Sequence, residues 1–498
     1  MIATEWTADH PRQTKYTVRR LRALTGRLLR PTGWLGAARE TGAEPLLTGR
    51  EEAYAESTLR KNARAMARDG AVPIAERALE RQVEQAVQAS PPEALRFLYT
   101  DMFDQVFWSK KPSHAGPIGN RGNRILGATY FGLTFARAGS GPLLAYHVSW
   151  HKPAAPLIDA LQDLHATETR AAWLSANIDV HVWDRGGAGA PTFDWAMGRD
   201  VPFLTVMQGS VNWKRFRHPQ AHTSLGVPIF VRPDAKMPDG SRVHGPPVLR
   251  EIIFPAHPEK GLGCSKALRY KTTAVLDEGQ LTTLDQVYKT RWPNNENGIK
   301  DLVSVGFDRN LDRTLVLSTS RGTDGKRTRL ADKRAQLDAE IRQLEPTAAS
   351  SRATRAKIAT RRKKLRRIEK ERIALAAPPD KAVRAPSGAE LLVKVLTMIV
   401  FNALRLMLAK SAHEAVRSMS IATVRGLLLS RSIFTVIDDL TLRLYVAPIR
   451  DVRERELQQQ LLDVANAAQL SIDDRLLVFA LQPCAPPRKL RVRRISRK

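Results

Sequence analysis

Three acidic residues have positions from which they could hold divalent cations. Asp101 lies inside a predicted strand, Asp184 ends another, and Glu296 lies in a predicted helix. Phosphoryl transfer by two metal ions needs carboxylates that converge on cations about 3.5–4 Å apart, one activating the attacking oxygen and one stabilising the leaving oxygen. Asp104, three positions after Asp101, is the alternative first ligand. The pattern predicts metal-dependent chemistry on phosphodiesters.

Alternating and helical periodicity predicts the elements that position these residues. Strands are expected at residues 95–103, 124–135, 142–150, 178–184 and 201–207, with helices at 156–165 and 190–199. This succession, β-β-β-α-β-α-β, is the order of the RNase H-like fold, so we expect an α/β protein with a mixed sheet. The first and fourth strands are neighbours in that fold, which would bring Asp101 and Asp184 together.

A β-rich insertion is predicted at about 208–280, where helical periodicity disappears and Pro, Gly and short β-runs increase. Helical spacing resumes at 281–305, the segment that contains Glu296. We therefore place the catalytic core at 93–325 and expect the insertion to interrupt it before the last carboxylate.

Helical regions are expected on both sides of this core. Residues 1–92 predict a basic helical DNA-binding domain, with a break at Asp69-Gly70; the alternative is helices that pack on the next domain. A heptad-like seam predicts a basic helical hairpin at 326–376. After a linker rich in Pro, residues 390–498 are expected to form a helical region with a basic tail.

The chain carries a formal net charge of +29, which indicates a polyanionic partner. The second arm of the hairpin is the most basic segment, because residues 351–372 contain eleven Lys or Arg against two Glu. We expect this arm to contact nucleic acid, the alternative being a solvated helix face. The candidate contacts are Arg361, Arg362, Lys363 and Lys364.

Around the three carboxylates the sequence resembles the DDE transposases of bacterial insertion sequences, in particular those with a β-insertion before the final Glu. The similarity covers roughly residues 95–320. The matching segments are Leu98-Tyr99-Thr100-Asp101, His181-Val182-Trp183-Asp184-Arg185-Gly186-Gly187 and Tyr288-Lys289-Thr290-Arg291-Trp292-Pro293-Asn294-Asn295-Glu296-Asn297-Gly298-Ile299-Lys300. The last segment is similar to the Tyr-Arg-Glu-Lys signature of the family.

The resemblance implies an enzyme that cleaves transposon ends and transfers the strands into target DNA. It implies that Asp101, Asp184 and Glu296 bind Mg²⁺, for which Mn²⁺ can substitute. Double-stranded DNA is the implied partner, with a homodimer assembled on it. The implied DNA contacts from the signature segments are Tyr288, Arg291, Trp292, Lys300 and Arg185.

Two of these contacts have a plainer interpretation, and two other functions remain open. Trp292 could be a core residue instead of a platform for an unpaired base, and Lys300 could simply form an ion pair with Glu296 one helical turn away. One alternative function is a metal-dependent nuclease of the same fold that does not join strands. The other is a transposase-derived DNA-binding protein without activity.

Other features limit the class of protein. Cys264 and Cys484 have no partners at metal-ligand spacing, which excludes a disulfide framework and a thiolate zinc site. The charged first residues predict no secretory signal, and polar residues interrupt the apolar stretch 391–408, so we expect a buried core helix and no membrane partner. A cytoplasmic, nucleoid-associated bacterial protein is expected. We interpret His147, His151 and His181 as structural.

Overall fold

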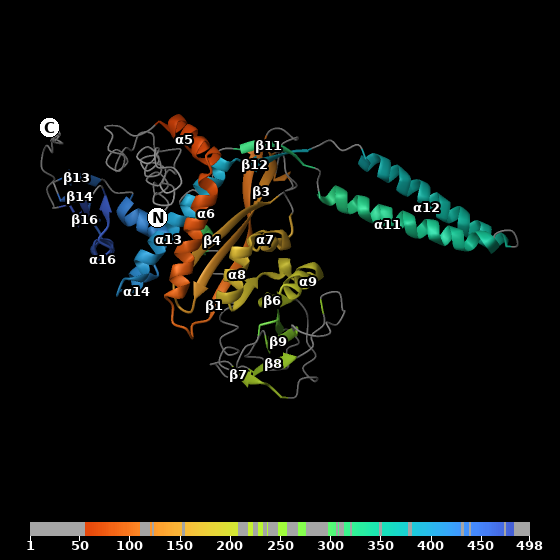
Figure 1. Ribbon diagram of the computed structural model, residues 1–498, viewed down its shortest axis with the longest axis horizontal. Helices are drawn as coiled ribbons and strands as arrows, with labels where there is room; N and C mark the ends of the chain where they lie inside the picture. Colours follow the sequence, from red (N-terminus) through yellow and green to blue (C-terminus); the bar gives the residue numbers. More distant parts are fainter. Residues whose placement is uncertain are drawn as a thin grey trace.

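A large mixed sheet lies at the centre of the computed structural model, with helices packed around it and a long helical hairpin projecting from one end (Figure 1). The class is therefore α/β, as the sequence predicts. The structure describes residues 55–109, 120–121, 124–151, 155–207, 218–222, 228–232, 237, 248–255, 267–274, 297–304, 307, 313–318, 321–347, 351–376, 381–429, 433–437, 440–472 and 475–482.

The central sheet has ten strands among the described residues. They are β1 (Arg96–Ser109), β2 (Asn120–Arg121), β3 (Arg124–Ala138), β4 (Leu144–His151), β5 (Val180–Trp183), β6 (Phe203–Met207), β7 (Ala221–His222), β8 (Pro228–Arg232), β9 (Arg250–Pro255) and β10 (Ala267–Thr272). Their spatial order is β2-β3-β1-β5-β6-β10-β9-β8-β7, and β4 also pairs with β3. The five strands predicted for the core are all present.

Strand direction divides the sheet into two parts. β1 is antiparallel to β3 and parallel to β5, which is in turn parallel to β6. β10 then pairs with β6 in antiparallel fashion, followed by β9, β8 and β7. These last four strands belong to the predicted insertion at 208–280, so its described part is β-rich and extends the core sheet.

Helices cover both faces of the core strands. On one face, Leu98, Trp183 and Phe203 pack beneath α7 (Leu157–Leu164) and α9 (Ala190–Gly198). On the other face, Tyr99 and Val182 belong to a core shared with α13 (Gly388–Ala409). Since successive side chains of a strand point to opposite faces, β1 and β5 are apolar on both sides, as strands buried on both faces must be.

One helix of the core was not predicted. α8 (Glu168–Asn177) lies between α7 and β5, so the observed order is β-β-β-α-α-β-α-β, and not the predicted succession with a single helix there. Only Leu174 of α8 is buried, so the segment has no apolar stripe of helical period. Its N-terminus is instead defined by Thr167, whose side chain accepts a hydrogen bond from the Arg170 N–H.

Two N-terminal helices, α5 (Glu56–Arg68) and α6 (Ala71–Gln88), meet at the predicted break. Gly70 adopts a φ of 86°, a left-handed conformation that glycine reaches without strain, and it separates the two helices. Their apolar residues belong to the same core as α13 and the sheet. The described part of region 1–92 therefore packs on the next domain, which was the alternative interpretation; residues 1–54 lie outside the description.

Three polar residues of the otherwise apolar helix α13 hold other segments to it. Lys394 Nζ donates to the Phe307 carbonyl, and the Asn402 amide pairs with both backbone groups of Ala145 on β4, at 2.7 and 2.8 Å. Arg405 forms an ion pair with Asp301. Because each of these three side chains has a polar partner, α13 can lie in the core.

By length and composition α13 is also the one described helix that could cross a membrane. More than half of its apolar window is buried inside the protein, including Leu392, Leu396 and Phe401. This is the burial of a core helix, as the polar interruptions of the stretch predict.

The hairpin consists of α11 (Arg321–Leu344) and α12 (Arg352–Ala376), with a short 3-10 turn, η6 (Glu345–Thr347), after α11. Leu337 and Ile341 of α11 and Ile358 and Ile368 of α12 are buried, as the predicted seam requires. Two antiparallel strands, β11 (Arg313–Ser318) and β12 (Lys381–Pro386), form its stem. β12 occupies part of the segment predicted as a linker.

The C-terminal region is not purely helical, contrary to expectation. A four-stranded sheet combines β13 (Ile433–Ile437), β14 (Thr441–Val446), β16 (Arg475–Leu481) and β15 (Ser471–Ile472). These apolar runs are only two to seven residues long, which suits strands and not helices. Its helical elements after α13 are α14 (Glu414–Arg417), α15 (Ile421–Val424), η7 (Arg425–Leu429) and α16 (Val452–Ala467). The basic tail lies outside the described residues.

A partly buried polar network joins α6 to α7, α8 and β4. Arg170 of α8 donates from Nε to Glu80 on α6 at 2.8 Å, and its Nη1 reaches the Asp163 carbonyl. His147 Nε2 on β4 lies 3.0 Å from Asp163 Oδ2. Beside this network, burial raises the pKa of Glu76 to about 7, against the opposing effect of Arg170.

We expect Arg405→Ala to lower the free energy of unfolding by about 3–5 kcal/mol, because Asp301 would be left buried without its cation. Chemical denaturation of the purified chain measures this. The exposed Arg443→Ala should change it by no more than about 0.5 kcal/mol. If Arg405→Ala is as stable as Arg443→Ala, the pair does not hold residue 301 to α13.

The raised pKa of Glu76 predicts a pH dependence of stability. The folded state keeps a proton that the unfolded state releases above its ordinary pKa, so the free energy of unfolding falls as pH rises from about 4.5 to about 7. Glu76→Gln cannot ionise, so it should lack this decrease in the free energy of unfolding. At pH 8 the variant should be more stable than wild type by about 1 kcal/mol or more. The exposed Glu93→Gln is the control; equal pH profiles for both variants would contradict the prediction.

Candidate active site

The parallel pairing of β1 with β5 brings Asp101 and Asp184 to neighbouring positions. The last paired residues in the register are Thr100 and Trp183; Asp101 is the next residue of β1, and Asp184 directly follows the end of β5. In parallel strands, residues in register point to the same face, and the following residues point to the opposite one. The register thus assigns both aspartates to the face that carries Tyr99 and Val182.

The local geometry of the two aspartates differs. Asp101 is half-buried and its Oδ1 accepts from the Met102 N–H at 2.8 Å. Asp184 follows β5 and its Oδ1 accepts from the Gly186 N–H at 2.7 Å, which caps the 3-10 turn η3 (Arg185–Gly187). The Asp184 carbonyl also accepts from Thr205 Oγ1 on β6, at 3.0 Å. Backbone contacts on both sides therefore fix this strand end.

Among the described residues, no Lys, Arg or His forms an ion pair with Asp184. This distinguishes it from the buried carboxylates that hold the fold together, such as Glu251, which pairs with Arg232 at 3.0 Å and with Arg269. A half-buried carboxylate without a protein cation is suited to binding a metal ion, because its negative charge is otherwise uncompensated.

The helical segment 297–304 lies against the same face of the sheet. At its start, a Cβ added to Gly298 would lie 3.1 Å from the Phe135 ring, so glycine permits this close approach; Phe135 is the partner of Tyr99 in the register. Beyond its end, the ring of Phe307 lies 5.9 Å from that of Phe103. The segment and Phe307 therefore lie over β3, the neighbour of β1, since the Phe307 ring is also 6.2 Å from that of Phe131.

Contacts from α13 hold this segment in place at both ends. Asp301 accepts from Arg405 and, through Oδ1, from the Ile421 N–H at 3.1 Å. Lys394 holds the Phe307 carbonyl and lies 4.5 Å from the centre of the Phe307 ring. The helix that follows position 296 is thereby anchored to the core.

Several predicted site residues lie outside the described part of the chain. They are Tyr288, Arg291, Trp292, Glu296 and the side chain of Arg185. Position 296 directly precedes the described helical segment, and Lys300 within that segment is exposed. The third expected ligand is therefore known only by its place in the chain.

The register separates the two candidates for the first ligand. Asp104 pairs with Tyr130, three positions along β1 from Asp101, and so belongs to the opposite face. Desolvation raises its pKa, although its side chain is exposed on the surface. Asp101 is therefore the candidate that shares a face with Asp184 and with the segment 297–304.

The donor set fits a hard divalent cation. Carboxylate oxygens are the ligands that Mg²⁺ and Mn²⁺ prefer, and Asp101 and Asp184 offer them from adjacent strands. Within the described ranges no three His, Cys, Asp or Glu residues form a group that could hold a metal ion. A metal site built on Asp101 and Asp184 would therefore need a third ligand from outside these ranges, which is where the expected ligand Glu296 lies.

The three histidines examined from the sequence have structural environments. His147 contacts Asp163, and His151 Nε2 lies 2.6 Å from Ser149 Oγ on the same strand. His181 is buried with its ring 5.3 Å from that of His165, and desolvation lowers the pKa of His181 to about 3. His181 therefore stays neutral near pH 7, and all three side chains contact residues of the sheet or of the helices on it.

The four basic residues expected to bind nucleic acid all lie on α12, outside the carboxylate region. Arg361 and Arg362 pair within the hairpin, with Glu340 and Glu345. Lys363 and Lys364 are exposed. The anchoring role of Asp301, Lys394 and Arg405 was missed, although the polar interruptions of the apolar stretch 391–408 were a signal for the last two.

Comparison with known proteins gives no assignment that bears on this site: the sequence matches no protein-family model and no curated protein.

Proposed function

We propose that this protein is a DNA transposase of the DDE type with an RNase H-like core. The strand order β4-β3-β1-β5-β6 supports the core assignment, because only β3 is antiparallel to its neighbours β1 and β4 while β1, β5 and β6 run parallel. The helices that follow β4 and β5 cover one face, and α13 covers the other. The insertion strands continue the sheet beyond β6.

The observation that carries the proposal is the register between β1 and β5. It gives two carboxylates, Asp101 and Asp184, consecutive places beyond the pair Thr100 and Trp183. The segment that begins one residue after Glu296 crosses the same face. Two acidic residues 83 positions apart thus lie at neighbouring strand positions, and the proposal adds Glu296 as the third ligand.

In the proposed mechanism Asp101, Asp184 and Glu296 hold Mg²⁺, or Mn²⁺ in its place. When bound, the cation would neutralise charge on the phosphate and lower the pKa of the attacking hydroxyl. In this proposal the backbone contacts of Asp184, and the contacts of α13 with Asp301 and Phe307, keep the carboxylates in fixed positions. Such preorganisation is what makes a charged site effective during the reaction.

The proposed reaction has two steps at one site. Water attacks a phosphodiester at the transposon end and frees a 3′-hydroxyl group. That hydroxyl then attacks a phosphodiester of the target DNA, so one bond breaks as the new one forms. Double-stranded DNA is the substrate in both steps, and we propose that two copies of the chain assemble on it.

The test uses the purified full-length chain and DNA that flanks its gene, with Mg²⁺ or with EDTA. We expect cleavage with Mg²⁺ and none with EDTA. An end already cut to expose its 3′-hydroxyl should then be joined to a target plasmid. Cleavage without joining would indicate the nuclease instead, and binding without either reaction would indicate an inactive DNA-binding protein.

Single charge-removing substitutions test the ligand assignment. Asp101→Asn and Asp184→Asn retain shape but lose the negative charge that Mg²⁺ requires, so each should lower the cleavage rate by at least about 100-fold. Glu296→Gln should do the same. DNA binding, measured by fluorescence anisotropy in EDTA, should persist in all three.

Asp104→Asn is the matched control, because it makes the same change three positions along β1 on the opposite face. It should cleave within about threefold of wild type. Loss of cleavage in Asp104→Asn with normal cleavage in Asp101→Asn would reverse the assignment. Normal cleavage by Asp184→Asn would remove that residue from the site.

A further inference from the structure

The two helices of the hairpin differ sharply in charge. Over 328–344, α11 carries four Lys or Arg against three Asp or Glu. Among the described side chains of α12 from 353 to 371, eight Lys or Arg face two Glu. The excess of positive charge is therefore on one helix, although both arms are equally exposed to solvent.

Ion pairs within the hairpin use part of this charge. Arg361 pairs with Glu340, Arg362 with Glu345 at 3.2 Å, and Arg367 lies 4.0 Å from Glu371. Five exposed cations of α12 have no ion pair among the described residues. They are Arg355, Lys357, Lys363, Lys364 and Arg366.

Helical periodicity sorts these five into two groups. Arg355, Lys363 and Arg366 lie within about 80° of one another around the helix, on the flank that also carries Arg362. Lys357 and Lys364 lie on the opposite flank. We call the first group together with Arg362, that is Arg355, Arg362, Lys363 and Arg366, the basic row.

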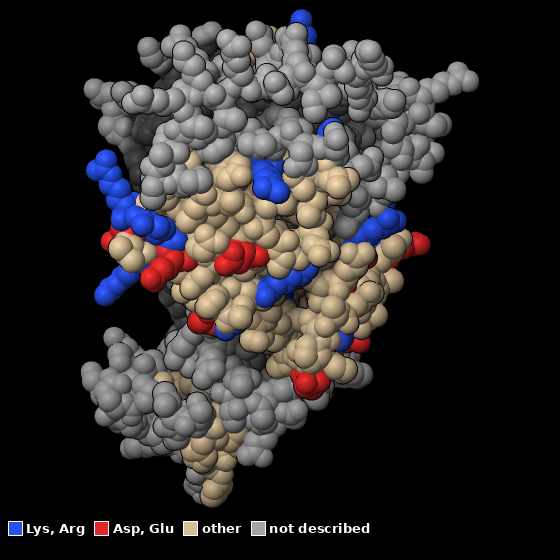
Figure 2. All heavy atoms as spheres, turned by 90° about the vertical axis from the view of Figure 1, so that its left-hand side faces the viewer, with Lys and Arg blue, Asp and Glu red and all other residues tan. Residues whose placement is uncertain are grey.

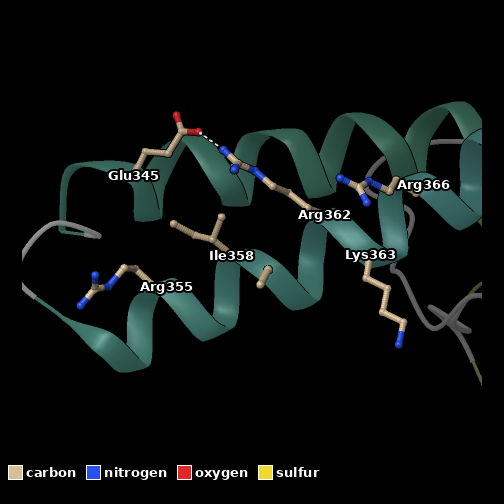
Figure 3. A pocket seen from close by; sticks show the side chains of 7 residues that line it. Glu345, Arg355, Ile358, Arg362, Lys363 and Arg366 are labelled. Carbon is tan, nitrogen blue, oxygen red and sulfur yellow. Dashed lines mark hydrogen bonds and ion pairs between the residues drawn. The ribbon is translucent and has the colours of Figure 1, made fainter.

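The basic row lines a concave surface of about 630 Å³ in the distal half of the hairpin. Ile358 and Ala359 form its floor, and Glu345 is its one acidic residue. Figure 3 shows Arg362 reaching toward Glu345, while Lys363 points away from both helices. The lining of this surface thus contains four cations and one carboxylate, and it is open to solvent.

This surface suits an extended polyanion better than a single small anion. From Arg355 to Arg366 the row extends over eleven positions, or about 16 Å along the helix, and no described wall closes around it. Duplex DNA carries one charge per about 1.7 Å of its axis, so a row of this length faces several phosphates. Arginine and lysine at such spacing bind the backbone without reading sequence.

The shape of the hairpin strengthens this interpretation. α11 contains 24 residues, and at about 1.5 Å per residue it projects about 36 Å from the β11/β12 stem, close to one turn of duplex DNA. At the opposite end of the molecule, Figure 2 shows described Lys and Arg interspersed with Asp and Glu. Among the described residues, that face therefore mixes charges of both signs, whereas α12 carries an excess of positive charge.

We propose that the basic row is a binding surface for the phosphate backbone of duplex DNA, separate from the carboxylate site. This inference rests on the proposed function in one respect: the proposed function identifies DNA as the polyanion. The row gives affinity, not sequence recognition. Because the hairpin projects from the core, the basic row binds a part of the duplex that is distant from the reacting phosphodiester.

The test replaces Arg355, Lys363 and Arg366 by Gln in the full-length chain. The probe is a labelled 40-base-pair duplex of mixed sequence, titrated in EDTA at a series of salt concentrations. We expect affinity at 0.1 M salt to fall by at least about tenfold. The slope of log K against log salt should become shallower by about 2–3, since each lost phosphate contact contributes about 0.9.

The matched control removes the same charge from the other helix: Arg329, Lys333 and Arg342 of α11 become Gln. For this control, the slope of log K against log salt should differ from that of wild type by no more than about 0.9, the contribution of one phosphate contact. The buried seam is untouched in both variants, so both should melt within a few degrees of wild type. A variant that melts much earlier is replaced by the single change Lys363→Gln, for which the slope should change by about 0.9.

Three results would overturn the proposal: an unchanged slope in the basic-row variant, an equal loss in the α11 control, or a duplex RNA of the same length that competes as well as DNA. An unchanged slope would leave the row to solvent or to an acidic protein surface. Failure of the proposed function looks different, because binding through the row in EDTA would persist in a chain that never cleaves.

Discussion

Strand β1 is covered on both faces of the sheet, and it is hydrogen-bonded to β3 on one side and to β5 on the other. This position constrains every element around it. Such a strand must be apolar at successive positions, and Phe97, Leu98 and Tyr99 meet this demand. A carboxylate can follow only where the cover from neighbouring helices thins, because an ionised group without a partner is costly in a dry core. Asp101 is half-buried and occupies that boundary. The location of the site is thus a consequence of how the strand is covered.

The same constraint explains the polar residues of α13. A helix that closes one face of a large sheet must be apolar, yet it must also hold a connecting segment that arrives after a long insertion. Lys394, Asn402 and Arg405 do this by bonding to backbone carbonyls, an edge strand and a buried aspartate. Lys394 and Asn402 are buried, Arg405 is partly buried, and each is paired, so losing a partner costs more than the contact itself contributes. The core helix thereby also supports the candidate site.

Sequence periodicity predicted the core strands well because each is an apolar run bounded by turn residues; the run 228–232 coincides with β8. It failed at α8, where a single buried leucine leaves no periodic signal. It also failed in the C-terminal region, whose short strands follow long helical stretches. The pairing partners of strands far apart in sequence, such as β6 with β10, follow from tertiary structure and not from local pattern.

For the candidate site, the residue types and their order were predictable, but their geometry was not. The choice between Asp101 and Asp104 depends on which face each occupies, and that requires the register with β5 and β3. Pairing of Arg361 and Arg362 inside the hairpin also could not be read from charge counts, because their partners are on the other helix. A run of like charges identifies a surface, whereas only the packing identifies which of its members face a ligand.

The stem of the hairpin has a consequence for how this architecture can vary. β11 and β12 are paired along six residues each, so the chain leaves the core and returns to it through adjacent strands. Everything beyond the stem could be lengthened, shortened or replaced by a tight turn while the two ends stay one strand spacing apart. Insertions of whole heptads would preserve the seam and move the tip by about 10 Å each. The arm therefore behaves as a module of adjustable length on a core whose own dimensions are fixed by packing.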